Sequence, residues 1–210
     1  MPHLVLLGDS IFDNKAYVAG GPDVVAQVRD DLPAGWTATL CAVDGATTAG
    51  VRSQLARVPA DATHLVLSIG GNDALGQSGV LARGARSVAE VLETLGEIGR
   101  GFERDYRAML DLVLARGLPT ALCTIYNPSY PEPARQRISV AALTFMNDPI
   151  VRIAAEHGLP LIDLRLVCTD PADYANPIEP SSRGGEKIAA AISGLVLNHD
   201  FRTRRSVIVR

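Results

Sequence analysis

The sequence lacks paired cysteines and any excess of positive charge, and each absence excludes a class of protein. Its three cysteines, Cys41, Cys123 and Cys168, are isolated and show neither a disulfide framework nor a metal-binding spacing. We therefore expect buried free thiols in a reducing compartment, which favours a cytoplasmic location. Lys and Arg number 20 against 23 Asp and Glu, a net charge of −3. This balance argues against nucleic acid or an anionic membrane as a partner.

Long apolar runs are also missing. The N-terminus has no positive segment and its apolar run is too short for a signal peptide, and no other run reaches membrane-spanning length. No cofactor motif is evident, so we expect neither a cofactor nor a metal. Hydrophobic residues nevertheless make up 47% of the 210 residues, enough for the core of one domain.

Short apolar segments alternate with helical patterns along the chain. The expected strands are Leu4–Leu7, Trp36–Val43, His64–Ile69, Pro119–Ile125 and Leu159–Leu164. The expected helices are Pro22–Asp31, Thr48–Val58, Leu81–Gly117 with a break near Gly99–Gly101, Ala134–His157 and Ser181–Leu197. This alternation predicts a single α/β domain over residues 1–199, a three-layer α/β/α sandwich around a five-stranded parallel sheet. Residues 200–210 form a tail that suits an edge strand or a contact between copies of the chain.

Chemically useful residues follow the first three expected strands. Ser10 ends the sequence Gly8-Asp9-Ser10, where glycine permits a tight turn before the serine. Gly45 follows the second strand and can bring its N–H close to a ligand, and Asn72 follows the third strand within Gly-Gly-Asn-Asp. Each motif alone also suits an ordinary cap or turn. Together they meet at the carboxyl ends of parallel strands, where α/β proteins bind ligands.

With these motifs the chain resembles the SGNH hydrolases, the family of GDSL esterases and lipases. The resemblance extends from Gly8 to about Ile192. It implies a flavodoxin-like fold and hydrolysis of a small-molecule ester through an acyl-serine on Ser10. It also implies an oxyanion hole made by the Ser10 N–H, the Gly45 N–H and the Asn72 side chain.

The chain departs from the family pattern at its last motif. The family has Asp-x-x-His before the final helix, whereas this sequence has Asn176 and Glu179 in those places. Serine needs a base to take its proton. His3, His64 and His157 are expected at the opposite edge of the sheet, and His199 follows the last helix, so none is expected to replace the missing imidazole.

Glu179 is therefore the candidate base. Burial would raise its pKa from an ordinary value of about 4.3 and improve its match to neutral pH. Asp9, Asp173 and Asn176 are candidate supporting residues, and a metal site made of Asp9, Asp173 and Glu179 has little support without histidines. The structural alternative is that Glu179 pairs with Arg183 or caps the helix near Ser181.

Two functions follow from these alternatives. The first is a slow or atypical serine esterase with Ser10 as nucleophile and Glu179 as base. The second is a non-catalytic protein that binds a small molecule on the same fold. The segments Tyr126–Pro133 and Gly76–Gly79 are expected to line the crevice. The substrate and the oligomeric state are left open by the sequence.

Overall fold

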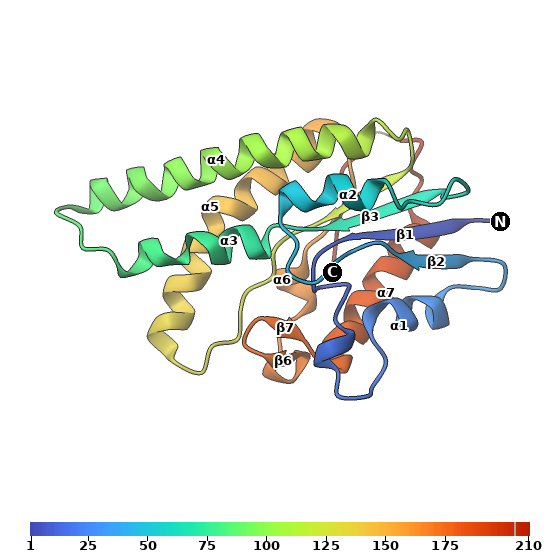
Figure 1. Cartoon of the computed structure of the whole chain (residues 1–210), viewed down its shortest axis with the longest axis horizontal. Coiled ribbons are helices and arrows are strands. Elements are labelled where there is room, and N and C mark those ends of the chain that lie inside the picture. Colours follow the sequence, from blue (N-terminus) through green and yellow to red (C-terminus); the bar gives the residue numbers. More distant parts are fainter. Residues whose placement is uncertain (204) are drawn as a thin grey trace.

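The computed structural model describes residues 1–203 and 205–210, so Arg204 of the predicted tail lies outside the described residues. A parallel sheet of six strands, in the order β2-β1-β3-β4-β5-β8, forms the centre (Figure 1). Its strands are β1 (His3–Gly8), β2 (Thr37–Leu40), β3 (His64–Ser68), β4 (Thr120–Cys123), β5 (Leu161–Ile162) and β8 (Ile208–Val209). The three-layer α/β/α prediction is confirmed.

Helices cover both faces of this sheet. One face carries α1 (Val24–Asp31), α6 (Leu164–Val167) and α7 (Ser182–Asn198), and the other carries α2 (Val51–Leu55), α4 (Val88–Leu114) and α5 (Pro133–His157). The helix α3 (Gly71–Gln77) follows β3, and a small antiparallel hairpin of β6 (Tyr174–Asn176) and β7 (Glu179–Pro180) precedes α7. Short 3-10 helices span Lys15–Tyr17, Thr48–Gly50, Ser78–Ala82 and Pro171–Asp173.

The continuous apolar runs become central strands because both faces of the sheet are covered. All six residues of β1 are buried, and its alternate side chains enter different cores. Leu4 and Leu6 pack with α1 and α7, whereas Val5 and Leu7 pack with α2 and α4. Such two-sided burial explains why the strands lack an alternation of polar and apolar residues.

Three expectations about the elements need correction. The sheet has six strands rather than five, because the tail supplies β8, which pairs in parallel with β5 as an edge strand. The predicted break at Gly99–Gly101 is wrong, because α4 runs unbroken from Val88 to Leu114. Gly99 instead permits close packing of α4 on α5, since a Cβ there would lie 2.6 Å from the carbonyl oxygen of Phe145.

The third correction concerns α5, which is long and apolar enough to cross a membrane by length and composition alone. In the fold its buried residues, among them Met146, Ile150 and Ile153, pack into the core beside the sheet. Figure 1 shows α3, α4 and α5 extending past the carboxyl ends of the strands, which places three helices beside the predicted site.

Candidate active site

The turn that carries Ser10 depends on Gly8. Gly8 has a φ of 135°, and a Cβ there would lie 1.8 Å from the carbonyl oxygen of Ser68. Only glycine fits this conformation and this contact. The buried Gln54 side chain holds both polar groups of Gly8, accepting from its N–H at 2.8 Å and donating to its carbonyl at 2.7 Å. Gln54 was not predicted, because its contact is made between α2 and β1.

Ser10 contacts the candidate base directly. The Ser10 hydroxyl donates a hydrogen bond of 3.1 Å to Oε1 of Glu179. Both side chains are buried, with 7% of each residue exposed. The second carboxylate oxygen of Glu179, Oε2, is buried and has no hydrogen-bond partner among the described residues. The fold therefore brings together a serine and a carboxylate that lie 169 residues apart in the sequence.

Burial raises the pKa values of two carboxyl groups beside Ser10, those of Glu179 and Asp9. The pKa of Glu179 is raised from 4.5 to about 7, mainly because burial penalises the charged form. The Ser10 hydrogen bond opposes this rise and the negative charge of Asp44 adds to it. Burial also raises the pKa of Asp9 to about 7. The hydrogen bond from the N–H of Ile11 opposes this rise, and the negative charges of Glu179 and Asp73 add to it.

The two other motifs are joined to each other beside Ser10. The side-chain amide of Asn72 donates to the carbonyl of Ala46 at 2.9 Å. Asp73 accepts from the backbone N–H of Thr48 at 3.1 Å and from its hydroxyl at 2.8 Å. These bonds connect the start of α3 to the loop of Gly45, which has a φ of 76°. Thr48 and Asp73 were missed because each suits an ordinary cap or turn.

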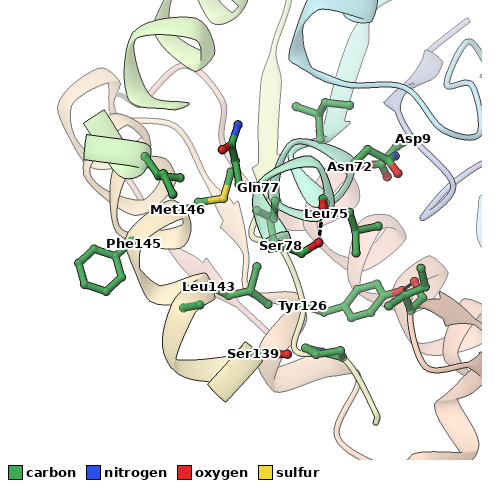
Figure 2. Close-up of a pocket in the computed structure, with 18 of the residues that line it drawn as sticks. Asp9, Asn72, Leu75, Gln77, Ser78, Tyr126, Ser139, Leu143, Phe145 and Met146 are labelled. Carbon is green, nitrogen blue, oxygen red and sulfur yellow. Dashed lines mark hydrogen bonds between the residues drawn. The ribbon is translucent and has the colours of Figure 1, made fainter. Parts of the chain in front are cut away.

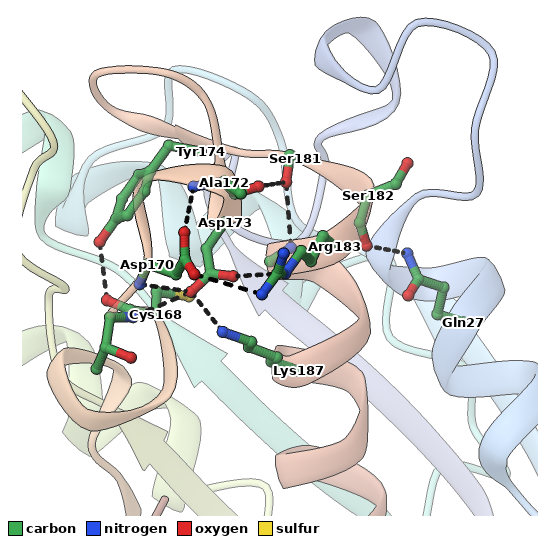
Figure 3. A network of polar contacts seen from close by, with 12 residues as sticks. Gln27, Cys168, Asp170, Ala172, Asp173, Tyr174, Ser181, Ser182, Arg183 and Lys187 are labelled. Carbon is green, nitrogen blue, oxygen red and sulfur yellow. Dashed lines mark hydrogen bonds and ion pairs between the residues drawn. The ribbon is translucent and has the colours of Figure 1, made fainter.

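Two predicted supporting residues lie outside the site. Asn176 is exposed at the end of β6, just before the turn to β7, and its side chain accepts from the N–H of Ile178. Asp173 is fully buried, and its carboxylate accepts from Lys187 at 2.7 Å and from the N–H groups of Thr169 and Asp170 (Figure 3). Both predictions of a supporting role are therefore corrected. Asp173 fixes the segment before α7 to that helix.

The structural alternative for Glu179 is also wrong. Arg183 lies 3.4 Å from Asp170 and 3.6 Å from Asp173 and so is directed at those carboxylates. The N-terminus of α7 is capped by Ser181, whose side chain accepts from the N–H of Gly184. Glu179 makes neither of the contacts that would explain it as a surface ion pair or a cap.

The histidines lie where the strand order predicted. His3 and His64 begin β1 and β3 at the far edge of the sheet, and His157 ends α5. His199 caps the C-terminal end of α7 and packs against Phe201. Within residues 1–203 and 205–210, no group of three or more His, Cys, Asp or Glu suits a metal ion.

A cleft opens beside Ser10 (Figure 2). Its walls come from α3, α4, α5 and the loop after β4, and they are mostly apolar. They include Leu75, Leu81, Leu95, Ile98, Tyr126, Leu143 and Met146. The two predicted lining segments both contribute, Tyr126 and Tyr130 from one and Gln77 and Ser78 from the other. The charged residues of the lining are Asp9 and Glu179, at the Ser10 end.

Comparison with known proteins identifies a family and several similar structures. The family model described as GDSL-like lipase/acylhydrolase matches residues 6–186. No curated protein matches the sequence. Similar solved structures include the extracellular lipase of Streptomyces rimosus, at 18% identity with 95% of this chain and 100% of that chain covered and a TM-score of 0.65. A lipase from a goat rumen metagenome is 18% identical, with coverages of 92% and 97% and a TM-score of 0.69.

The aryl esterase of M. smegmatis is 12% identical, with coverages of 94% and 99% and a TM-score of 0.62. At these identities the likeness shows a shared fold. The family match covers most of the chain, from the middle of β1 to the first turns of α7. The chain therefore belongs to the GDSL-like lipase/acylhydrolase family, which acts on esters.

Proposed function

We propose that this protein is a serine esterase in which Ser10 attacks the ester and Glu179 replaces histidine as the base. The observation that carries the proposal is the 3.1 Å hydrogen bond from the Ser10 hydroxyl to the buried Glu179 carboxylate. A carboxylate is an effective base near neutral pH when its pKa approaches the working pH. The pKa of about 7 for Glu179 meets that condition.

The chemistry requires one proton carrier. Ionised Glu179 takes the hydroxyl proton as the Ser10 oxygen bonds to the ester carbonyl carbon. The tetrahedral intermediate then collapses by breaking its bond to the alcohol oxygen, which receives the proton from Glu179. A water molecule repeats the sequence on the acyl-serine, losing a proton to Glu179 and releasing the acid and free Ser10.

The charge that develops on the carbonyl oxygen needs hydrogen-bond donors. We assign this role to the backbone N–H groups of Ser10 and Gly45 and to the Asn72 amide. Asn72 supports the assignment because its amide carries two N–H donors and only one is needed for Ala46. The apolar cleft beside Ser10 suits the acyl part of a small or medium ester.

Hydrolysis of short-chain aryl esters tests the proposal. Wild type should release the phenol and, on brief reaction, carry an acyl group on Ser10 detectable by mass spectrometry. Ser10→Ala should lose both signals, whereas Ser53→Ala, a matched change at an exposed serine, should retain both. Turnover by Ser10→Ala equal to that of wild type would contradict the proposal. Tight ligand binding by wild type without turnover of any ester would favour the non-catalytic alternative.

A further inference from the structure

The charged groups around Ser10 are carboxylates from several elements. Asp9 and Asp13 follow β1, Asp44 follows β2, Asp73 lies in α3 and Glu179 lies in β7. The negative charges of these groups act on one another. Asp44 raises the pKa of Glu179, and Glu179 and Asp73 both raise the pKa of Asp9. The backbone N–H of Asp44 donates to Asp13 at 2.9 Å, so these two carboxylates share one loop junction.

Cations do not neutralise this group. Within residues 1–203 and 205–210, no Lys, Arg or His lies within 4 Å of any of the five carboxylates. Lys15 is exposed and donates to the carbonyl of Gly21. Arg135 stacks on Tyr130, 3.8 Å from the ring centroid, in the part of the cleft wall formed by the loop before α5.

An independent observation points to a ligand at this position. Glu179 is 93% buried and lines the cleft together with Ser10, and its Oε2 atom has no hydrogen-bond donor among the described residues. An unpartnered buried carboxylate oxygen is costly, because it has lost water without gaining a replacement donor. A ligand that brings a positively charged N–H group to Glu179 would remove that cost.

We propose that the preferred ester has an alcohol part that carries an ammonium group, held between Glu179 and Asp44. The inference rests on the proposed function, because it assigns the two sides of the same ester. The apolar cleft takes the acyl chain, and the alcohol part then extends from Ser10 toward the acidic side formed by Asp13, Asp44 and Tyr17. Tyr17 belongs to this side because its hydroxyl donates to Asp44 at 2.7 Å.

An ammonium group at this place has a consequence for the base. An adjacent positive charge favours the ionised form of a carboxylic acid. The bound substrate would therefore increase the fraction of Glu179 that can accept the Ser10 proton. A substrate with an anionic alcohol part, such as a phosphate, would do the opposite and would be repelled by the same carboxylates.

An isosteric pair of esters tests the inference. The cationic member is 2-(dimethylammonio)ethyl butyrate, and 3-methylbutyl butyrate is its neutral counterpart of the same shape. Titration of released butyric acid at pH 7 should give a kcat/KM about tenfold higher for the cationic ester at low salt. The preference should decline as the salt concentration rises to about 0.5 M, because salt screens the attraction.

Charge-removal variants locate the effect. Asp44→Asn should lower the ratio of the two kcat/KM values about threefold. Asp30→Asn removes the same charge from an exposed position on α1 and should leave the ratio unchanged. Equal kcat/KM values for the two esters in wild type, or the same ratio in wild type and Asp44→Asn, would overturn the inference.

A binding measurement separates this inference from the proposed function. Ser10→Ala cannot form the acyl-serine, so calorimetry on this variant reports the affinity of the intact esters. Tighter binding of the cationic ester supports the ammonium site even if wild type hydrolyses neither ester, in which case only the esterase proposal fails. Equal binding of the two esters, with turnover of both by wild type, overturns the ammonium site and leaves the esterase proposal standing.

Discussion

Asp173 and Glu179 are buried carboxylates six residues apart on the two sides of one hairpin, yet their surroundings are opposite. Asp173 accepts from Lys187 and from two backbone N–H groups, and these partners lower its pKa despite its burial. Among the described residues Glu179 accepts from the Ser10 hydroxyl alone, and burial raises its pKa to about 7. Burial alone therefore does not decide the charge of a carboxyl group; the number and kind of donors around it do.

The difference separates a structural carboxylate from a chemical one. Asp173 is ionised at neutral pH and is paired with Lys187 and Arg183, which suits a group that holds α7 in place. Glu179 is near its midpoint at neutral pH and is paired with no cation in the part of the chain that the structure describes. It is therefore able to exchange a proton, which Asp173 is not.

The largest effect is expected for the loss of the base. Glu179→Gln should lower kcat/KM for a short-chain aryl ester about a thousandfold, because glutamine cannot take the Ser10 proton. In wild type the rate should rise with pH through about 7, as Glu179 ionises. Glu186→Gln, at an exposed glutamate of α7, is the matched control and should keep both the rate and its pH dependence. A loss of less than about threefold in Glu179→Gln would refute the assignment of the base.

The next effect concerns the structural carboxylate. Asp173→Asn should lower the free energy of unfolding by about 2 to 4 kcal/mol, because the substitution leaves Lys187 and Arg183 without their buried counter-charge. Urea denaturation at pH 7 measures the change, and Asp30→Asn provides the control at an exposed aspartate. A free energy of unfolding equal to that of wild type would mean that Asp173 contributes no more to stability than a surface charge does.

The pH dependence of stability should differ between the two carboxylates. Glu179 has a higher pKa folded than unfolded, so the folded state binds its proton more tightly. As the pH rises from about 4.5 to about 7, this group therefore lowers the free energy of unfolding. Glu179→Gln removes this loss, and above pH 7 it should be about 1 to 3 kcal/mol more stable than wild type.

Asp173 should behave in the opposite sense. Its pKa is lowered by folding, so its contribution is complete above its ordinary pKa of 3.8 and is lost as the pH falls below that value. Chemical denaturation of wild type, Glu179→Gln and Asp173→Asn across pH 3 to 8 measures both trends. A constant difference between Glu179→Gln and wild type at every pH would contradict the raised pKa.

The smallest effect is expected for Arg183. Its side chain is 57% exposed and lies 3.6 Å from Asp173. Arg183→Ala should therefore cost less than about 1 kcal/mol in thermal or urea unfolding. The rise of esterase rate with pH should keep its midpoint, because Arg183 is directed at Asp170 and Asp173 rather than at Glu179. A shifted midpoint would show that Arg183 reaches the Ser10 site after all.

Much of this architecture is readable from the sequence because strand ends and catalytic motifs coincide. The apolar runs predict five of the six strands, and the rule that the carboxyl ends of parallel strands share one edge of the sheet places Ser10, Gly45 and Asn72 together. The same rule moves the histidines to the far edge and leaves Glu179 as the base candidate. The contact between Ser10 and Glu179 confirms that the two residues meet.

The remainder depends on contacts that no local pattern encodes. Asp173 was grouped with the site because it lies near Glu179 in the sequence. Its carboxylate instead binds Lys187 and nearby backbone N–H groups. Asn176 follows the local preference of asparagine for turns. Gly99 was interpreted as a helix break, whereas it permits contact between α4 and α5. Strand β8 is only two residues long and is recognisable only beside β5.

The two hydrogen bonds between the Gln54 side chain and the Gly8 backbone link the segment of the nucleophile to helix α2. Beyond the end of β2 at Leu40, Gln54 supplies both a donor and an acceptor to the last residue of β1, as a neighbouring strand would. One amide side chain thus extends the hydrogen bonding of the sheet up to the residue two positions before Ser10. The position of the attacking oxygen is consequently sensitive to the packing of α2, so substitutions beneath that helix can alter the reaction without contacting the substrate.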